Sequence, residues 1–248
     1  MCTIHDTILQ PIEVVKTSIR ESTPAICENG EPIIQVRAEH SRIFIEPIYY
    51  HQKIPNSLQV IYLRQGVYER LTQALLLLPK NFSLILYDGY RPFQVQQFLF
   101  ANFSKQIAQL FPHFTEQEVV RETRKYVAYP SMDHAHFAPH LTGGAIDLTL
   151  GDLKGNALNL GSAFDEISEK SATRYFEQHP EENWEACVHR RLLYNCMTMV
   201  GFTNYSEEWW HFDFNNVSSA RRVGAQEASY GAVEAIIQDN KVKEFRFL

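Results

Sequence analysis

The stretch His140-Leu-Thr-Gly-Gly-Ala-Ile-Asp-Leu-Thr-Leu150 decides how the centre of this chain folds. Gly143 and Gly144 permit a tight turn, because glycine adopts backbone conformations that are closed to other residues. From residue 145 to 150 the residue types alternate as they do along a strand. The sequence therefore predicts a turn that leads from His140 directly into a strand carrying Asp147.

A second stretch, Glu208-Trp-Trp-His-Phe-Asp-Phe214, is rich in aromatic residues and is typical of a strand over residues 209–214. Side chains alternate between the two faces of a strand, so His211 and Asp213 are expected to share one face. Glu208 lies outside that alternation. It needs a bend or a bulge before the strand if it is to reach the same site as His211.

The two stretches together supply the residues of a zinc site. A catalytic zinc ion usually takes three protein ligands and leaves one position for water or substrate. His140, Asp147 and His211 would fill the three positions, with one zinc ion per chain. Glu208 would take a proton from water and return it to the leaving amine. Each residue alone has an ordinary surface or hydrogen-bonding role as its alternative, but the combination indicates a zinc peptidase.

The pattern His-x-x-Gly-x-Ala-x-Asp, followed by Glu-x-x-His, resembles the zinc D-alanyl-D-alanine dipeptidases, the group that includes the dipeptidase of vancomycin resistance. Three further matches follow the family order, namely Tyr87-Asp-Gly-Tyr-Arg-Pro92, Asp147-Leu-Thr-Leu150 and Gly161-Ser-Ala-Phe-Asp165. The resemblance covers residues 43–214. It implies zinc-dependent hydrolysis of D-Ala-D-Ala, or of a closely related D,D-dipeptide, and a connection with cell-wall peptides.

The resemblance also implies roles in substrate binding. Arg91 is expected to stabilise the negative charge that develops on the substrate carbonyl oxygen, and a structural salt bridge with Asp88 is the alternative. Asp165 is expected to bind the free amino terminus of the dipeptide, because a carboxylate selects an ammonium group. One aromatic residue, Tyr49 or Tyr50, is expected to approach the substrate. We select Tyr50, with core packing as the alternative for either ring.

The chain departs from the family just before its first metal ligand. Relatives commonly have Ser-x-His there, whereas this chain has Ala138-Pro-His140, so a hydroxyl expected near the substrate is missing. The preceding segment, residues 131–139, is longer than usual. It contains His134 and His136, which are either ligands of a second metal, residues of the cleft or surface histidines. These differences bear on the range of substrates rather than on the chemistry.

The remaining sequence predicts an α+β fold, in which a small antiparallel sheet carries the zinc site and helices flank it. The predicted strands cover residues 12–15, 32–36, 43–50 with its loop, 84–90 and 241–247. The predicted helices cover residues 62–78, 93–110, 115–126, 181–199 and 225–239. Gln94, Gln96 and Gln97 are predicted to be solvated residues of the second helix. The capping box Thr115-Glu-Gln-Glu118 opens the third.

Three segments are expected within this single fold. Residues 43–214 form the catalytic domain, and residues 215–248 form an extension that packs on it. Residues 1–42 precede the family resemblance and have no assigned role. Packing on the core, covering of the cleft and oligomerisation are all compatible with the sequence of this N-terminal segment. The sequence does not predict the oligomeric state.

Composition narrows the class of protein. The 248 residues are 45% hydrophobic and 21% charged, as in ordinary soluble globular proteins, and the net charge of -6 argues against a nucleic-acid partner. The first residues lack the pattern of a secretory signal, and no apolar run reaches membrane-spanning length, which argues against a membrane partner. The four cysteines form no Cys-x-x-Cys pair. A cytoplasmic protein with reduced thiols is expected.

Two alternatives to a dipeptidase remain open on the sequence. The site could serve a D,D-carboxypeptidase or endopeptidase that acts on cell-wall peptides. It could also belong to a zinc-bearing binding module without turnover. Glu208 and Arg91 argue against the module, because zinc binding alone requires neither residue.

Overall fold

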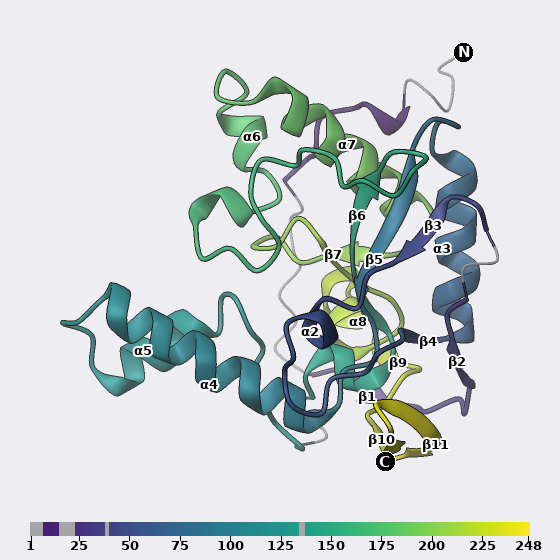
Figure 1. Ribbon diagram of the computed structural model, residues 1–248, viewed down its shortest axis with the longest axis vertical. Coiled ribbons are helices and arrows are strands. Elements are labelled where there is room, and N and C mark those ends of the chain that lie inside the picture. The colour runs from purple at the N-terminus through teal and green to yellow at the C-terminus, as the bar shows by residue number, and fades with distance from the viewer. Residues whose placement is uncertain (1–6, 15–22, 38–39, 134–136) are drawn as a thin grey trace.

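A computed structural model of the protein describes residues 7–14, 23–37, 40–133 and 137–248 (Figure 1). His134 and His136 lie outside the described residues, as does the end of the strand predicted for residues 12–15. The described part of that segment, residues 12–14, forms no strand.

A five-stranded sheet forms the centre of the molecule (Figure 1). Its strands, in spatial order, are β3 (Ile43–Ile45), β5 (Ser83–Asp88), β6 (Ala145–Gly151), β8 (His211–Asp213) and β7 (Thr203–Asn204). The pair β3 and β5 is parallel, and the other three pairs are antiparallel. The α+β fold predicted from the sequence is therefore confirmed, with one parallel edge strand in addition.

One face of this sheet is apolar and forms the main core. Leu84 and Leu86 of β5 are buried there beside Ile146, Leu148 and Leu150 of β6. The buried residues of helix α3 (Gln65–Leu77) belong to the same cluster, as do Leu192, Leu193, Cys196 and Met197 of helix α7 (Trp184–Met199). Burial of one such leucine contributes about 1.5–3 kcal/mol, so this face holds the sheet to its helices.

The other face of the sheet carries the polar residues. Asp147 on β6 and His211 on β8 alternate with the apolar residues, and the strand register places them directly opposite each other. Asp88 of β5 in turn lies opposite Asp147, because a β-bulge between Leu86 and Asp88 shifts the register by one residue. Three neighbouring strands thus contribute one ionisable side chain each to a single row.

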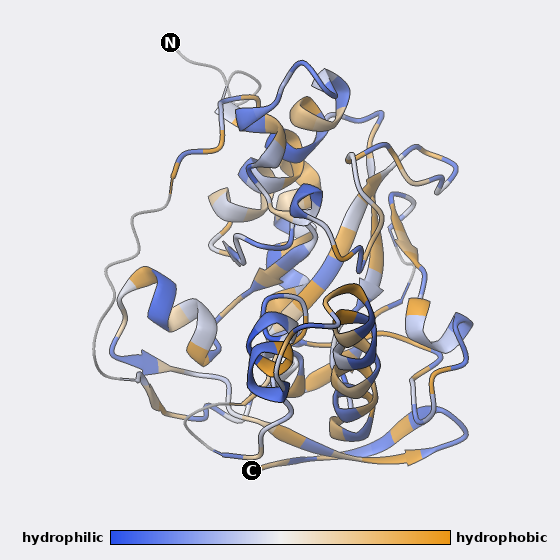
Figure 2. Ribbon diagram, turned by 90° about the vertical axis from the view of Figure 1, so that its left-hand side faces the viewer, coloured by the Kyte–Doolittle hydropathy of each residue, from blue (hydrophilic) through white to orange (hydrophobic). Residues whose placement is uncertain are grey.

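Two helices form an arm that projects away from the sheet (Figure 1). The long helix α4 (Phe93–Leu110) buries Val95, Leu99 and Phe103 at helical spacing, and its opposite side is exposed. Helix α5 (Glu116–Thr123) begins at the predicted capping box. Figure 2 shows polar and apolar residues on the ribbons of these helices, as expected for amphipathic helices at the surface.

Segments from both ends of the chain are joined around Arg64. This fully buried side chain donates to both carboxylate oxygens of Glu28, at 2.8 and 2.9 Å, and to the carbonyl oxygens of Thr142, at 2.9 Å, and Gly231, at 3.2 Å. Two short strand pairs lie next to these contacts in the sequence. They are β1 (Ala25–Ile26) with β9 (Glu227–Ala228), and β2 (Ile33–Gln35) with β4 (Tyr62–Arg64). The two terminal segments therefore brace the turn that follows His140.

The C-terminal hairpin consists of β10 (Val233–Gln238) and β11 (Lys241–Phe247). The helix predicted for residues 225–239 is wrong, because the alternating side chains of β10 pair with β11 instead. The helix predicted from residue 62 is also too long at its start, since residues 62–64 form strand β4. In both places strand pairing, of β10 with the adjacent β11 and of β4 with β2, prevails over local helical spacing.

The remaining elements are short. They are α2 (Ile48–His51), the 3-10 helices η1 (Pro139–Thr142) and η2 (Glu169–Ser171), α6 (Tyr175–Gln178) and α8 (Val217–Val223). Among the described residues, no helix combines the length and the apolar character needed to cross a membrane.

Candidate metal centre and substrate pocket

The predicted glycine turn brings His140 over the central sheet. Helix η1 ends at Gly143, whose φ of 68° lies in the left-handed region that favours glycine. At Gly144 the chain passes so close to its neighbours that a Cβ atom would lie 2.7 Å from the carbonyl oxygen of Phe214. The two glycines therefore allow the chain to reverse and enter β6, which carries Asp147.

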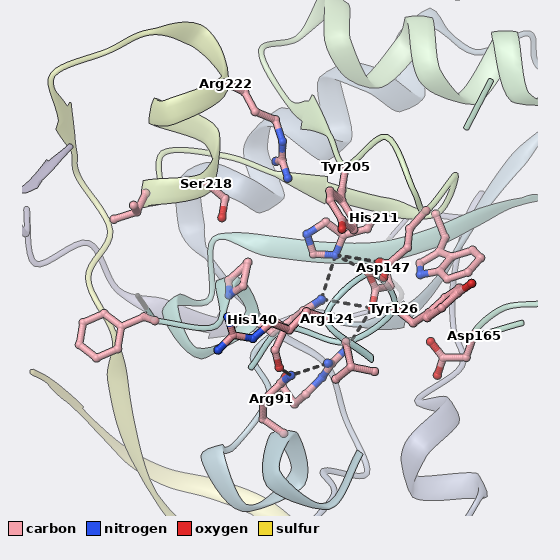
Figure 3. Close-up of a pocket in the computed structure, with 18 of the residues that line it drawn as sticks. Arg91, Arg124, Tyr126, His140, Asp147, Asp165, Tyr205, His211, Ser218 and Arg222 are labelled. Carbon is pink, nitrogen blue, oxygen red and sulfur yellow. Dashed lines mark hydrogen bonds and ion pairs between the residues drawn. The ribbon is translucent and has the colours of Figure 1, made fainter. Parts of the chain in front are cut away.

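Three ligand atoms meet at one point of the polar face (Figure 3). The Nε2 atom of His140 lies 3.2 Å from Oδ2 of Asp147, and Nδ1 of His211 lies 2.9 Å from Oδ1 of the same carboxylate. The two imidazole nitrogens are 3.2 Å apart. Ligands of a tetrahedral zinc ion with bonds of about 2.0–2.1 Å are separated by about 3.3 Å, so these spacings match the metal.

The outer nitrogen of each histidine fixes where its proton resides. Nδ1 of His140 lies 2.7 Å from the carbonyl oxygen of Gly89, which can only accept, so Nε2 presents a lone pair. Nε2 of His211 faces Oδ2 of Asp213 at 3.2 Å, which leaves the lone pair on Nδ1. Three lone pairs, including that of Asp147, thus face one another in a buried site. A cation satisfies this arrangement, and two histidines with one carboxylate fit zinc.

The electrostatics of the cluster agree with this assignment. Burial alone would raise the pKa of Asp147, but His140 and His211 hold it well below its usual range. Burial alone would lower the pKa of His211, but Asp213 and Asp147 outweigh it and raise this pKa to about 10. The cluster therefore has a strong preference for positive charge.

Glu208 reaches the site through the bend that the sequence requires. Its backbone N–H donates to the carbonyl oxygen of Tyr205, and the N–H of His211 donates to the carbonyl oxygen of Glu208, so a turn precedes β8. The carboxyl group is buried, with Oε2 at 3.9 Å from Nδ1 of His211. Burial raises the pKa of Glu208 well above its usual value, although His211 opposes this shift. Such a carboxylate is suited to accept a proton.

Arg91 is buried beside the candidate metal ligands and makes four hydrogen bonds. Nε donates to Asp88 at 2.7 Å, and Nη1 donates to Gln96 at 2.9 Å. Nη2 donates to Tyr49 Oη at 3.3 Å and to Asp147 Oδ2 at 3.2 Å. The structural salt bridge with Asp88 is therefore present. Because a guanidinium has five N–H donors, one remains for a group in the pocket.

Gln96 corrects the prediction that this glutamine is solvated. Its side chain is only 2% exposed, and besides accepting from Arg91 it donates to the carbonyl oxygen of Ala128 at 2.7 Å. Gln96 lies three and seven residues before Leu99 and Phe103, on the buried side of α4. That spacing was visible in the sequence and indicates the buried face of the helix.

Of the two candidate tyrosines, the structure places Tyr49 and not the selected Tyr50 at this pocket. Tyr49 is buried and lines the pocket, and its hydroxyl donates to Oδ2 of Asp165 at 2.9 Å. Tyr50 is 37% exposed and lies outside this pocket. Successive residues of a helix point in directions about 100° apart, so only one of the two rings in α2 can face the site.

Asp165 lies in the same pocket on the loop before η2. Its φ of 59° places it in the left-handed region, and burial raises the pKa of its carboxyl group to about 7, although Arg91 opposes the shift. Figure 3 shows Asp165 at one side of the cavity and the metal ligands at its centre. An acidic group is therefore available beside the metal site without being one of its ligands.

One cavity of about 280 Å³ joins these residues. The sequence-predicted residues that line it are Arg91, His140, Asp147, Asp165, Glu208 and His211. Sequence reasoning missed another group, which consists of Arg124, Tyr126, Tyr205, Ser218, Arg221 and Arg222. These residues belong to no recognisable motif, and tertiary packing alone brings them to the cavity.

The fold and the site define a class of protein, namely a zinc metallopeptidase, with two histidines and one carboxylate at its candidate metal site. The sequence model of the peptidase M15 family, described as D-ala-D-ala dipeptidase, matches residues 50–227. Since this is more than half of the chain, the protein belongs to that family.

Two curated relatives carry the name D-alanyl-D-alanine dipeptidase. The protein from Synechocystis is 31% identical over 60% of this chain and 68% of its own length. The protein from Escherichia coli is 36% identical over 55% of this chain and 58% of its own length. Parts of both relatives therefore have no aligned counterpart here.

Two solved structures are more distantly similar. VanYB in complex with D-Ala-D-Ala is 16% identical, with a TM-score of 0.38 over 68% of this chain and 82% of that one. A vancomycin resistance D,D-pentapeptidase VanY variant in complex with Zn(II) is 14% identical, with a TM-score of 0.41 over 82% of this chain and 90% of that one.

Proposed function

We propose that the protein is a zinc-dependent dipeptidase that hydrolyses D-Ala-D-Ala, or a closely related D,D-dipeptide, to free amino acids. The observation that carries this proposal is the convergence of three potential ligand atoms, from His140, Asp147 and His211, beside the buried carboxyl group of Glu208. Membership of the family supports the type of substrate.

His140, Asp147 and His211 would hold the zinc ion. When bound, zinc polarises a carbonyl group and lowers the pKa of water. Asp213 and the carbonyl oxygen of Gly89 keep the two imidazole rings oriented, because each accepts the proton of the outer ring nitrogen.

Glu208 is proposed as the general base and acid. Its buried carboxylate accepts the proton of the attacking water and then delivers it to the nitrogen of the leaving amino acid. Arg91 is held on three sides, by Asp88, Gln96 and Tyr49. Its remaining N–H is proposed to donate to the carbonyl oxygen as negative charge develops there.

Asp165 is proposed to bind the ammonium group of the substrate. Tyr49 donates to one of its oxygens, and the other oxygen is available for a charged donor. Tyr49 thereby replaces Tyr50 as the proposed aromatic contact. A site that needs a free amino terminus excludes peptides whose amino terminus is blocked, and this favours a dipeptidase over an endopeptidase.

The test is release of free D-alanine from D-Ala-D-Ala by the zinc-loaded protein. L-Ala-L-Ala and an amino-blocked D,D-dipeptide serve as parallel substrates. Glu208→Ala is expected to retain zinc and to lose at least about 100-fold in turnover, the lower range for one general acid–base group. Glu207→Ala is the matched control, because Glu207 is the adjacent residue and its side chain is exposed.

The proposal is supported if only the free D,D-dipeptide is hydrolysed and if the Glu208→Ala variant loses this turnover while the Glu207→Ala variant retains it. Equal turnover in the Glu208→Ala and Glu207→Ala variants removes Glu208 from the mechanism. Cleavage of the amino-blocked peptide removes the proposed role of Asp165 and favours an endopeptidase. Bound zinc without turnover of any peptide favours a binding module.

The proposal retains residues 43–214 as the catalytic domain and includes a cytoplasmic location with a role in cell-wall peptide turnover. Antibody detection in cell fractions tests the location. Accumulation of D,D-dipeptide in cells that lack the protein tests the role.

A further inference from the structure

The pocket has a basic side in addition to its acidic side. Asp165 and Glu208 lie near the metal ligands, whereas Arg124 follows α5 and Arg221 and Arg222 occupy the last turn of α8. Figure 3 shows Arg222 and Ser218 extending from α8 at the side of the cavity away from Asp165. A protein of net charge -6 thus gathers three arginines at this cavity in addition to Arg91.

The three arginines differ in how their charge is compensated. Arg222 donates to the buried carboxylate of Asp213 and is therefore paired. Arg124 lies over the ring of Tyr129, with its guanidinium carbon 4.8 Å from the ring centroid. Arg221 donates to the neutral hydroxyl of Thr23 at 3.2 Å. Within residues 7–14, 23–37, 40–133 and 137–248, no carboxylate forms a salt bridge with Arg124 or Arg221.

A dipeptide with two neutral side chains leaves this basic side incompletely matched. Its terminal carboxylate supplies one negative charge, whereas two guanidinium groups with no carboxylate partner among the described residues line the cavity. A second hollow of about 480 Å³ borders the first and shares Arg124, Ala128 and Phe137 with it, so the described residues leave space beside Arg124 for a side chain longer than a methyl group.

We propose that Arg124 and Arg221 form an anion-binding subsite for the second residue of the substrate, and that dipeptides with an acidic second residue are preferred. One guanidinium binds the terminal carboxylate and the other binds the side-chain carboxylate. This inference rests on the proposed dipeptidase function and specifies the substrate class of the same site.

Arginines at the ends of helices also interact favourably with the helix dipole. Arg121 fulfils that role in the last turn of α5 without lining the pocket, and it pairs with Glu118 at 4.0 Å. If these arginines act only on the helix dipole, replacement of Arg121 or of Arg124 should have the same effect on the substrate preference. If Arg124 belongs to a subsite, the two replacements should have different effects. This contrast makes Arg121→Gln the matched control.

The experiment compares D-Ala-D-Glu with D-Ala-D-Gln, which have nearly the same shape and differ by one charge. Values of kcat/KM are measured on the zinc-loaded full chain, with D-Ala-D-Ala as the reference. D-Ala-D-Glu is expected to be preferred over D-Ala-D-Gln by about fivefold, the upper range for one partly exposed ion pair. The preference is expected to fall as salt is added.

The variant that combines Arg124→Gln and Arg221→Gln is expected to abolish this preference, whereas Arg121→Gln retains it. Calorimetric binding of both dipeptides to zinc-loaded Glu208→Ala protein provides a readout that does not require turnover. If the protein binds D-Ala-D-Glu more tightly than D-Ala-D-Gln but the wild type hydrolyses neither, the result supports the subsite and overturns the dipeptidase function.

Turnover of D-Ala-D-Ala without any preference for D-Ala-D-Glu overturns the subsite and leaves the dipeptidase standing. The subsite is also overturned if the Arg121→Gln variant loses as much of the preference for D-Ala-D-Glu as the Arg124→Gln and Arg221→Gln double variant. The preference would then reflect surface charge in general. Thermal unfolding of all variants establishes that each compared protein is folded.

Discussion

Replacement of Asp213 by asparagine should weaken zinc binding although Asp213 is not a proposed ligand. This wholly buried carboxylate accepts from Nε2 of His211 at 3.2 Å, from Asn216 at 2.6 Å and from Arg222. Asparagine has the same shape but presents an NH₂ group in place of one oxygen. If that group faces the imidazole, the proton of His211 moves to Nδ1, and the lone pair is lost from the metal site.

The magnitude follows from the role of the outer partner. Loss of a carboxylate that orients a metal-binding histidine typically weakens metal affinity about 10- to 100-fold. This range corresponds to about 1.4–2.7 kcal/mol. Stability of the metal-free protein should also fall, by about 1–3 kcal/mol, because a buried donor of His211 or Asn216 is left without its acceptor.

The assay is competition for zinc between the protein and a chelator of known affinity, at a fixed pH near neutrality. Asp239→Asn is the matched control. Asp239 is exposed in the turn of the β10–β11 hairpin, and its φ of 53° is one that asparagine adopts readily. Asp239→Asn should leave zinc affinity unchanged. Zinc affinity within twofold of the wild type in Asp213→Asn would refute the assigned orientation of His211.

Three further outcomes are expected. Asp147→Ala should lose stoichiometric zinc binding in equilibrium dialysis, since it removes a proposed ligand, and full occupancy would contradict the ligand set. Gln96→Leu should lower turnover and reduce stability by about 1–3 kcal/mol in denaturant titration, because Nη1 of buried Arg91 loses its acceptor. Glu177→Gln should destabilise the protein at neutral pH by about 1–2 kcal/mol, because Arg191 donates to both oxygens of Glu177 at 2.6 and 2.7 Å. Burial alone would raise the pKa of Glu177, but the hydrogen bonds from Arg191 outweigh it and lower this pKa. The ion pair therefore stabilises the folded protein fully above the usual glutamate pKa, and this stabilisation is lost as the pH falls through the lowered pKa. A stability difference between Glu177→Gln and the wild type that persists in acid would contradict this reasoning.

The proposed metal site was accessible to sequence reasoning because its information is local. Two glycines after His140 permit a turn, and the alternation of β6 then fixes which face Asp147 occupies. The alternation of β8 likewise fixes His211 relative to Asp213. Strand periodicity is a property of the backbone, so it is readable without knowledge of the partner strands.

Strand pairing and long-range contacts decided the structure where the local sequence pattern failed to predict it. The segment 233–238 has helical spacing, yet it forms a hairpin with residues 241–247 that packs beside the turn bearing His140. The role of Arg64 was equally hidden, because its partners come from segments 36 and 167 residues away. Contacts of such separation leave no periodic trace in the sequence.

The sequence by itself determined the elements that hold the proposed metal ligands and predicted the α+β class, because glycine turns and strand alternation act over a few residues. Only the tertiary structure decided that Tyr49 rather than Tyr50 faces the pocket, that Gln96 supports Arg91, and that Arg124 after α5 and the arginines of α8 line the same cavity. These features depend on the rotation of helices about their axes and on how the helices pack against the sheet. Both are set by the whole core rather than by any one segment.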